Sequence, residues 1–235
     1  MSESPSIFHV ERQELSFSPK PWAFAIERRA EIDVYFEGLR HEKPAIWNGR
    51  VLLLHHQEFA GGVLRGEYLE TDYASFAAWR YWGRPSATVR DCFGAAAVMA
   101  GDGAFLLGVM GPHTFNSGKI YFPCGTPDPD DIIDGKVDLS HSVQRELKEE
   151  TGFDVSEFDI EPGWTMVVDE PLIALIKVLR SNEAAKVLRG RVLGHLASER
   201  EPELSDVCVV RGVDDFDPAM PRFIRAFLAS RLGKG

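Results

Sequence analysis

RELKEETGF, the stretch from Arg145 to Phe153, carries one arginine and three glutamates within one or two helical turns and then reaches a glycine. On a helix, Glu149 and Glu150 follow Glu146 at offsets of three and four residues, which brings the three side chains to one face. Exposed like charges at these offsets repel by about 0.2–0.5 kcal/mol per pair. A divalent cation reverses this repulsion, because hard cations prefer carboxylate oxygens as ligands. The stretch therefore predicts a metal-binding face, with a merely solvated helix surface as the alternative.

Other side chains of the same helix are expected to position these glutamates. Val143 and Leu147 point to another side of the helix and can anchor it in a hydrophobic core. Arg145 lies four residues before Glu149, so its guanidinium can brace a carboxylate from behind. The sequence thus predicts an acidic face held in place by an apolar face and one arginine.

Composition and charge limit the functions that the chain can have. Its 235 residues are 44% hydrophobic and 26% charged, as in a globular protein with a sizeable core. The net charge of -10 argues against a nucleic-acid polymer as partner, because polyanions are bound by basic surfaces. The three cysteines form no CxxC pair, which favours reduced thiols and a cytoplasmic location. The N-terminus does not resemble a signal peptide, and no apolar run is long enough to cross a membrane.

The first 90 residues are expected to form an N-terminal α+β extension. Residues 2–22 show no sustained period and are expected to be irregular. Hydrophobic patterning then predicts two helices and two strands, with Thr71 or Asp72 as the N-cap of the second helix. The helices are expected over 23–40 and 71–82, and the strands over 50–56 and 62–71.

From Asp91 onward the pattern changes to alternating strands and helices. Gly101-Asp102-Gly103 separates two apolar runs and predicts a β-hairpin. The helix that contains RELKEETGF is expected to begin at an Asp138 or Ser140 cap and to stop at Gly152. Further strands are expected over 119–125, 164–169, 171–180 and 204–212, and further helices over 181–199, capped by Ser181 or Asn182, and 220–232. This mixture favours an α/β or α+β sandwich, with a division into residues 1–90 and 91–235.

The order Arg-Glu-Leu-x-Glu-Glu-x-Gly-Phe resembles the core of the Nudix box, the signature of the Nudix hydrolase superfamily. In that family the pattern reads Gly-x5-Glu-x7-Arg-Glu-aliphatic-x-Glu-Glu-x-Gly-aliphatic. The preceding KIYFPCG is similar to the family's strand that ends in Pro-Gly-Gly. The resemblance implies an α/β/α sandwich around a mixed sheet. It also implies hydrolysis of the diphosphate linkage in a nucleoside diphosphate joined to another group X, with Mg²⁺ or Mn²⁺.

The sequence departs from this pattern upstream of Arg145. Gly125 precedes Arg145 by 20 positions, where the family's box has 14, so six residues are extra. Either Asp131 or Asp138 takes the first acidic position, in both cases with aspartate in place of glutamate. Cys124 stands where the first glycine of Pro-Gly-Gly would be, and a phenylalanine replaces the final aliphatic residue. These differences concern the loop before the helix and leave the helix itself intact.

The resemblance assigns a role to each residue of the box. Glu149 and Glu150 match the main metal-binding glutamates, and Glu146 matches a position that binds metal or orients the attacking water as a base. Arg145 matches the bracing arginine, and the backbone carbonyl of Cys124 occupies the place where an oxygen often joins the metal shell. Many members add an acidic residue from outside the box. The expected choice here is Glu201, with Glu199, Glu203, Asp169 and Glu170 as further candidates.

The substrate is less closely defined by the sequence. The N-terminal segment and the extended loop before the helix resemble a branch of Nudix proteins that acts on UDP-glucose and UDP-galactose. ADP-ribose, dinucleotides and coenzyme A remain open as substrates, as does a catalytically silent Nudix-fold module that binds a nucleotide or a protein. Family members often form homodimers. Four aromatic residues are candidates for a base-stacking pocket, although helical spacing is more typical of a core: Trp47, Tyr73, Phe76 and Trp79.

Overall fold

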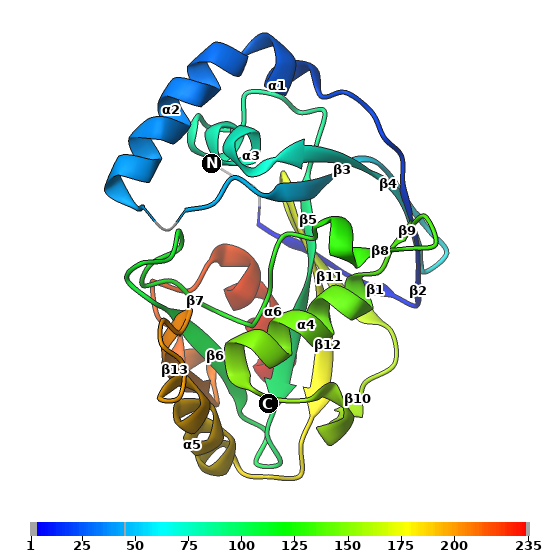
Figure 1. Cartoon of the computed structure of the whole chain (residues 1–235). Coiled ribbons are helices and arrows are strands. Elements are labelled where there is room, and N and C mark those ends of the chain that lie inside the picture. Colours follow the sequence, from blue (N-terminus) through cyan, green and yellow to red (C-terminus); the bar gives the residue numbers. More distant parts are fainter. Residues whose placement is uncertain (1–3, 45, 234–235) are drawn as a thin grey trace.

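The computed structural model describes residues 4–44 and 46–233, and in this part of the chain two mixed sheets and six α-helices make up the fold (Figure 1). The larger sheet is built mostly from the C-terminal part of the chain. The smaller sheet and three of the helices are built mostly from the N-terminal part, which lies at the top of the view in Figure 1. The prediction of an α/β fold is therefore confirmed.

The larger sheet has the strand order β1-β11-β12-β5-β6-β13. The pairing of β12 with β5 is parallel, and the other pairings in this sheet are antiparallel. The expected hairpin at Gly101-Asp102-Gly103 is confirmed, because it joins β5 to β6. The bounds are β1 Ser6–Val10, β5 Asp91–Met99, β6 Phe105–Met110, β7 Ile120–Tyr121, β10 Asp159–Ile160, β11 Trp164–Asp169, β12 Leu172–Arg180 and β13 Leu204–Val210, with β7 beside β6 and β10 beside β12.

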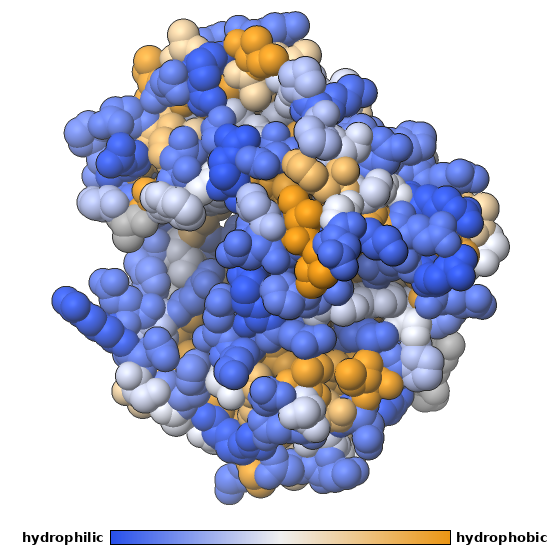
Figure 2. Space-filling model, turned by 45° about the vertical axis from the view of Figure 1, so that its right-hand side comes forward, coloured by the Kyte–Doolittle hydropathy of each residue, from blue (hydrophilic) through white to orange (hydrophobic). Residues whose placement is uncertain are grey.

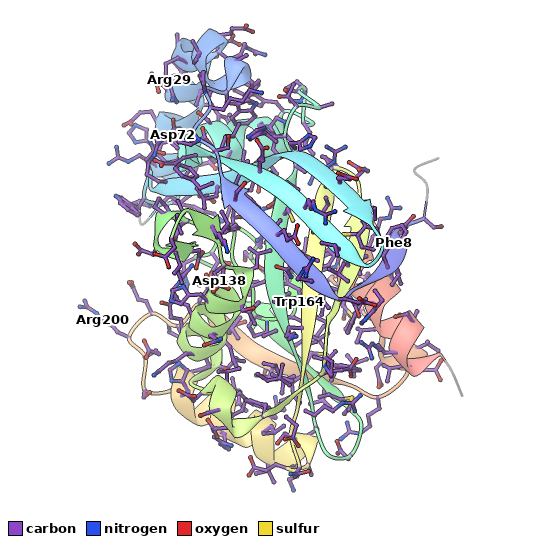
Figure 3. All side chains as sticks on the ribbon, turned by 90° about the vertical axis from the view of Figure 1, so that its right-hand side faces the viewer. Phe8, Arg29, Asp72, Asp138, Trp164 and Arg200 are labelled. Atoms are coloured by element: carbon purple, nitrogen blue, oxygen red, sulfur yellow. The ribbon has the colours of Figure 1, made fainter. Side chains whose placement is uncertain are left out.

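Successive residues of β5 show how helices cover both faces of this sheet. Phe93 packs edge-on against Phe223 of α6 (Arg222–Leu232), with ring centroids 5.7 Å apart. Gly94 points to the other face, where Val143 of α4 (Leu139–Thr151) lies directly above it. Helix α5 (Ala185–Leu196) packs on β13. Figure 3 shows α4 and α6 on opposite sides of the strands, so the expected α/β/α sandwich around a mixed sheet is confirmed.

The smaller sheet has the order β3-β4-β2-β9-β8 and supports a second hydrophobic core. Asp72 accepts a hydrogen bond from Ser75 N at 2.8 Å and is the N-cap of α3. The same carboxylate binds Arg29 at 2.7 Å, which ties α2 to α3 near the top of Figure 3. The bounds are β2 Arg12–Phe17, β3 Arg50–Ala60, β4 Val63–Asp72, β8 Ile132–Ile133, β9 Lys136–Val137, α1 Ala23–Glu27, α2 Arg29–Glu42 and α3 Tyr73–Tyr81.

Strands are exchanged between the two parts of the chain. β1 pairs with β11 at the edge of the larger sheet, and β2 pairs with both β4 and β9 in the smaller one. The expectation of irregular structure over residues 2–22 is therefore wrong for Ser6–Val10 and Arg12–Phe17, while residues 2 and 3 lie outside the described part. The physical reason is that these strands find their partners far away in the sequence, so local periodicity does not reveal them.

Two helix boundaries also differ from the sequence-based expectation. The helix expected over 23–40 is broken at Arg28, which lies between α1 and α2. Helix α5 begins after Ala184 without a side-chain cap, so the caps expected at Ser181 and Asn182 are wrong. Ser181 instead accepts a hydrogen bond from Glu183 N at 3.1 Å in the turn before the helix. Among the described residues, no helix is long and apolar enough to cross a membrane.

Candidate active site

Helix α4 carries the three glutamates, and its ends are fixed by local chemistry. Asp138 accepts hydrogen bonds from Ser140 N at 2.9 Å and His141 N at 3.1 Å, so it is the N-cap. Gly152 adopts the left-handed conformation, with φ of 75°, that ends the helix as predicted. Val143 and Leu147 are buried in the core, as expected. The helix is therefore anchored along one side over its whole length.

Two of the glutamates turn inward, toward the loop that follows β7. Glu150 is 3% exposed and accepts a hydrogen bond from the backbone N–H of Cys124 at 3.1 Å. Glu146 is 9% exposed and lies against Gly125, where a Cβ atom would come within 2.4 Å of its Oε1. Glu149 is different, because its side chain is 61% exposed. The structure thus brings Glu146, Glu150 and the 123–125 loop together, with Glu149 at the rim.

Burial changes the acidity of both inward carboxyls. Desolvation raises the pKa of Glu146 to about 7, against the opposing charge of Arg145. Desolvation and the charges of Glu146 and Glu203 raise the pKa of Glu150 well above its usual range. The Oε2 atom of Glu150 is buried and has no hydrogen-bond partner among the described residues. A buried polar atom without a partner is costly, so the site is complementary to a bound cation or donor.

Arg145 braces the site through several carboxylates. Its guanidinium lies 2.9 Å from Glu146, 3.2 Å from Asp131, 3.3 Å from Asp128 and 3.5 Å from Glu149. Asp131 is fully buried, and its other oxygen lies 3.2 Å from His141 Nδ1. Of the two candidates for the first acidic position of the box, Asp131 therefore meets the arginine, whereas Asp138 caps the helix. The six extra residues accordingly fall between Asp131 and Arg145.

Among the candidates for an acidic residue from outside the box, Glu203 is the one whose charge acts on the box glutamates most visibly. Its charge raises the pKa of both Glu146 and Glu150. Glu203 is exposed as a whole residue, yet desolvation of its carboxyl group raises the pKa of Glu203. The charge of His113 opposes this rise. Glu201, which the sequence favours, and Glu199 are exposed in the loop before β13.

Position along the chain offers a signal that could have favoured Glu203. It directly precedes Leu204, the first residue of β13, and its carbonyl accepts a hydrogen bond from Gly111 N at 2.8 Å. Residues at the end of a strand are held more firmly than residues in the middle of a loop. The two acidic residues at the turn between β11 and β12 form ion pairs elsewhere, Asp169 with Arg222 and Glu170 with Arg90.

The residues present fit a divalent cation, although the side chains are not arranged as a finished site. Within residues 4–44 and 46–233, no three His, Cys, Asp or Glu residues are close enough together to hold a metal ion. The donors are nevertheless hard carboxylate oxygens, and one of them is buried without a partner. The cation would be held by Glu146, Glu149, Glu150 and the backbone carbonyl of Cys124. The Glu149 side chain points into solvent and would have to turn inward.

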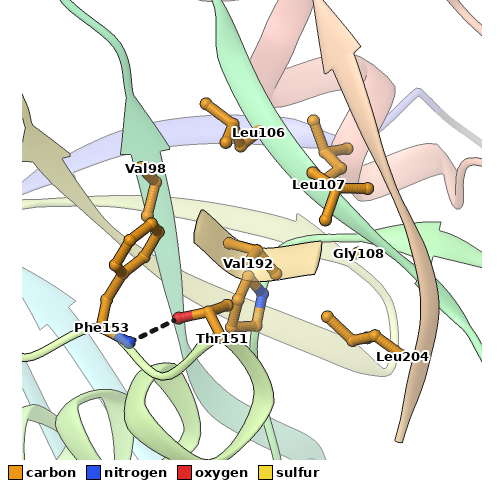
Figure 4. Close-up of a pocket in the computed structure, with 10 residues that line it drawn as sticks. Val98, Leu106, Leu107, Gly108, Thr151, Phe153, Val192 and Leu204 are labelled. Atoms are coloured by element: carbon orange, nitrogen blue, oxygen red, sulfur yellow. Dashed lines mark hydrogen bonds between the residues drawn. The ribbon is translucent and has the colours of Figure 1, made fainter. Parts of the chain in front are cut away.

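Two cavities and three of the candidate aromatic residues lie apart from the box glutamates. A void of about 10 Å³ between α5, the end of α4 and the sheet is lined mainly by apolar residues and holds no more than a water molecule (Figure 4). A groove of about 450 Å³ lies between β1 and α6, on the α6 side of the sheet. Phe76 and Trp79 belong to the core of the N-terminal part, as the more typical interpretation predicted. Trp47 is 81% exposed.

Two solved structures are similar to this chain. The MutT protein from Methanosarcina mazei Go1 is 19% identical, with coverage of 62% of this chain and 98% of that chain and a TM-score of 0.39. The Nudix hydrolase RenU from M. smegmatis is 11% identical, with coverage of 61% and 86% and a TM-score of 0.38. No family model matches the sequence, and no curated protein is significantly similar to it. The function is therefore inferred from the side chains of α4 and its surroundings.

Proposed function

We propose that the chain is a metal-dependent Nudix hydrolase that cleaves the diphosphate linkage of a nucleoside diphosphate joined to another group X. One observation carries this proposal. Glu146 and Glu150 are buried side by side against the 123–125 loop, and one oxygen of Glu150 has no partner among the described residues. A protein without a use for a cation gains nothing from burying two carboxyls that repel each other. The Nudix-box order of the residues agrees with this interpretation.

Each residue of the site has a distinct chemical task in this proposal. A bound Mg²⁺ or Mn²⁺ would neutralise the diphosphate and lower the pKa of a water molecule. Glu149 and Glu150 bind the cation, and Arg145 positions Glu146 and Glu149 through its ion pairs. Glu146 takes a proton from the attacking water, for which a pKa of about 7 is well matched near neutral pH. Glu203 is the outer carboxylate of the site, in preference to Glu201.

The finer assignments follow from the resemblance of the N-terminal part and the long loop. We propose UDP-sugars as the first substrates to examine, with the N-terminal part closing the pocket for the uridine or the sugar. A cytoplasmic location is proposed from the sparse, unpaired cysteines, and a homodimer from the resemblance to the Nudix family as a whole. The two-part division at residue 90 also remains a prediction, qualified by the strand exchange between the parts.

The test is a hydrolysis screen combined with conservative variants. Purified protein is incubated with UDP-sugars, ADP-ribose, dinucleotides and coenzyme A, with Mg²⁺, with Mn²⁺ and with a chelator, and mononucleotide release is measured. Glu149→Gln and Glu150→Gln should lower kcat by at least about 100-fold while the protein stays folded. Glu58→Gln, an exposed glutamate of β3, is the matched control and should keep full activity. Full turnover in both box variants would rule the assignment out.

The outer carboxylate can be identified in the same experiment. Glu203→Gln should lower kcat, whereas Glu201→Gln should resemble the control, because the charge of Glu203 is among the main ones that act on Glu146 and Glu150. The reverse result would make Glu201 the outer carboxylate. A protein that binds nucleotides but releases no product with any metal would instead be the catalytically silent module.

A further inference from the structure

Arg80, near the end of α3, is a cation without a carboxylate partner. Its Nη2 donates a hydrogen bond to Asn116 Oδ1 at 3.0 Å, and its guanidinium lies 5.8 Å from the ring centre of Phe115. Among the described residues no carboxylate forms a salt bridge with it. The buried Asp91 lies near enough to feel its charge, but the two groups form no ion pair. Because the Arg80 side chain is half-buried, holding this charge unpaired is costly.

A chain of hydrogen bonds connects Arg80 with Tyr121, which lies in the strand that leads to the 123–125 loop of the acidic site. Asn116 Nδ2 donates to the hydroxyl of Tyr121 at 3.0 Å, so both ends of the amide are engaged. Tyr121 is in β7, three residues before Cys124, and the charges of Glu150 and Glu203 act on its hydroxyl and help to raise its pKa. Burial raises the pKa of the Tyr73 hydroxyl in α3; the charge of Arg80 opposes this rise, and the charge of Glu203 adds to it. The segment from Gly111 to Cys124 thus contacts both sides: Asn116 bonds to Arg80, whereas Gly111 bonds to Glu203 and Cys124 to Glu150.

The surface of the molecule has a recess between its two parts. Figure 2 shows the surface hollowed at the left of the view, between the N-terminal part above and the larger sheet with its helices below. The 111–119 loop spans the two parts, because Lys43, which directly follows α2, donates to the carbonyl of Thr114 while Gly111 is bonded to Glu203. Phe115 of this loop packs against Tyr73 and Tyr81 of α3. Arg80 thus contacts a loop that is fixed to both parts of the molecule.

The acidic site needs positive charge from a residue outside the Nudix box. Arg145 is already engaged with four carboxylates and has little capacity left for an anion. A diphosphate that approaches Glu146, Glu149, Glu150 and Glu203 is repelled until cations compensate. An arginine held by an amide and an aromatic ring loses little side-chain freedom when it binds a phosphate with two N–H groups.

We infer that Arg80 binds a phosphate of the substrate's diphosphate group and that Asn116 positions its guanidinium for this contact. This inference rests on the proposed function and adds a substrate-binding residue outside the Nudix box. The ligand chemistry is that of a phosphate anion, bound through charge-assisted hydrogen bonds from a cation in the N-terminal part.

The test measures the binding of α,β-methylene-UDP and α,β-methylene-ADP, which cannot be cleaved, by calorimetry in the presence of Mg²⁺. Arg80→Met should weaken both by about 10- to 100-fold. Asn116→Asp should weaken both comparably, because the new carboxylate neutralises an arginine that is still present. Arg80→Lys should fall between Arg80→Met and the wild type. Arg65→Met is the matched control for the loss of one exposed cation, since Arg65 pairs with Glu14 on β2.

The outcomes separate this inference from the proposed function. If the wild type hydrolyses its substrate and Arg80→Met keeps the Kd and KM of the control within about twofold, the role of Arg80 is overturned and the function stands. If the wild type hydrolyses nothing but Arg80→Met and Asn116→Asp both lose analogue binding, the Arg80 site stands and the function fails. Unchanged binding in Asn116→Asp contradicts the inference. Should Arg80→Met not fold, Asn116→Asp and Arg80→Lys carry the comparison.

Discussion

At the scale of single residues, the buried Glu146 should make the metal-free protein more stable in mild acid. Its pKa is about 7 in the folded protein, against 4.5 for an unperturbed glutamate. Between these values the folded state holds the proton more tightly than the unfolded state, so the free energy of unfolding falls as the pH rises. The stabilisation is complete below the unperturbed pKa of 4.5 and is lost as the pH rises through about 7. It amounts to at most about 3 kcal/mol.

This prediction is checked by comparing thermal unfolding of the wild type and Glu146→Gln in a chelator. At about pH 8 the variant should be the more stable of the two, because it carries no buried charge. At about pH 5 the two should converge, because the wild-type carboxyl is then protonated. Parallel pH profiles for the two proteins would show that Glu146 is not buried as the structure has it. Added Mn²⁺ should stabilise both proteins at the higher pH, because Glu149 and Glu150 remain in the variant, and should stabilise the wild type more.

Substitution of Gly125 should lower activity strongly while it changes stability little. A Cβ atom there would lie 2.4 Å from Oε1 of Glu146, so Gly125→Ala forces the carboxylate to rotate away. The obstacle is the flexible end of a side chain, so we expect a change in unfolding free energy below about 1 kcal/mol. A displaced catalytic group can cost about 100-fold in kcat. Gly190→Ala in α5, where a Cβ atom meets nothing within 4 Å, is the control and should remain fully active.

At the scale of elements, the seating of α4 on β5 depends on the absence of a side chain at Gly94. A Cβ atom there would come within 2.6 Å of Val143 Cγ2 and 3.0 Å of the Leu139 carbonyl oxygen. Gly94→Ala should therefore push the helix off the sheet and cost about 1–3 kcal/mol in denaturant unfolding, with loss of activity as the glutamates move. Adding Val143→Ala should restore only part of the stability, since the contact with the backbone of Leu139 remains. Full recovery in the double variant would mean that the side-chain contact alone sets the spacing.

Elements with local signals were predictable from the sequence, whereas those that depend on distant partners were not. Helix α4 has a capping aspartate, an apolar face and a stop glycine within its own residues, and it forms as expected. β1 and β2 are only five and six residues long and pair with strands that are distant in the chain, so local patterning does not predict them. The same limit applies to the site. The box glutamates follow one another in a single helix, whereas Glu203 and Arg80, for which we propose roles at the site, lie beside β13 and in α3, far away in the sequence.

At the scale of the whole molecule, the strand exchange predicts that the two parts depend on each other for stability. β1 covers the edge of the larger sheet at β11, and β8 and β9 complete the smaller sheet from within the C-terminal part. Removing residues 1–90 would strip the edge of β11 and leave β8 and β9 without β2. It would also uncover the apolar residues that face the N-terminal part, since Leu54 and Tyr68 share one hydrophobic cluster with Phe93 and Leu139.

We therefore expect the full chain to unfold in a single cooperative transition and a chain that begins at Asp91 to be unfolded or aggregated. Calorimetry of the full chain, with the ratio of van't Hoff to calorimetric enthalpy near one, is the measurement. Near-UV circular dichroism of the shortened chain shows whether its aromatic residues are still packed. A shortened chain with its own cooperative unfolding transition would mean that residues 91–235 form an independent domain, and that the pairing of β1 with β11 is not needed for its stability. If it also hydrolysed substrate with an unchanged KM, the recess between the two parts, and Arg80 with it, would have no part in binding.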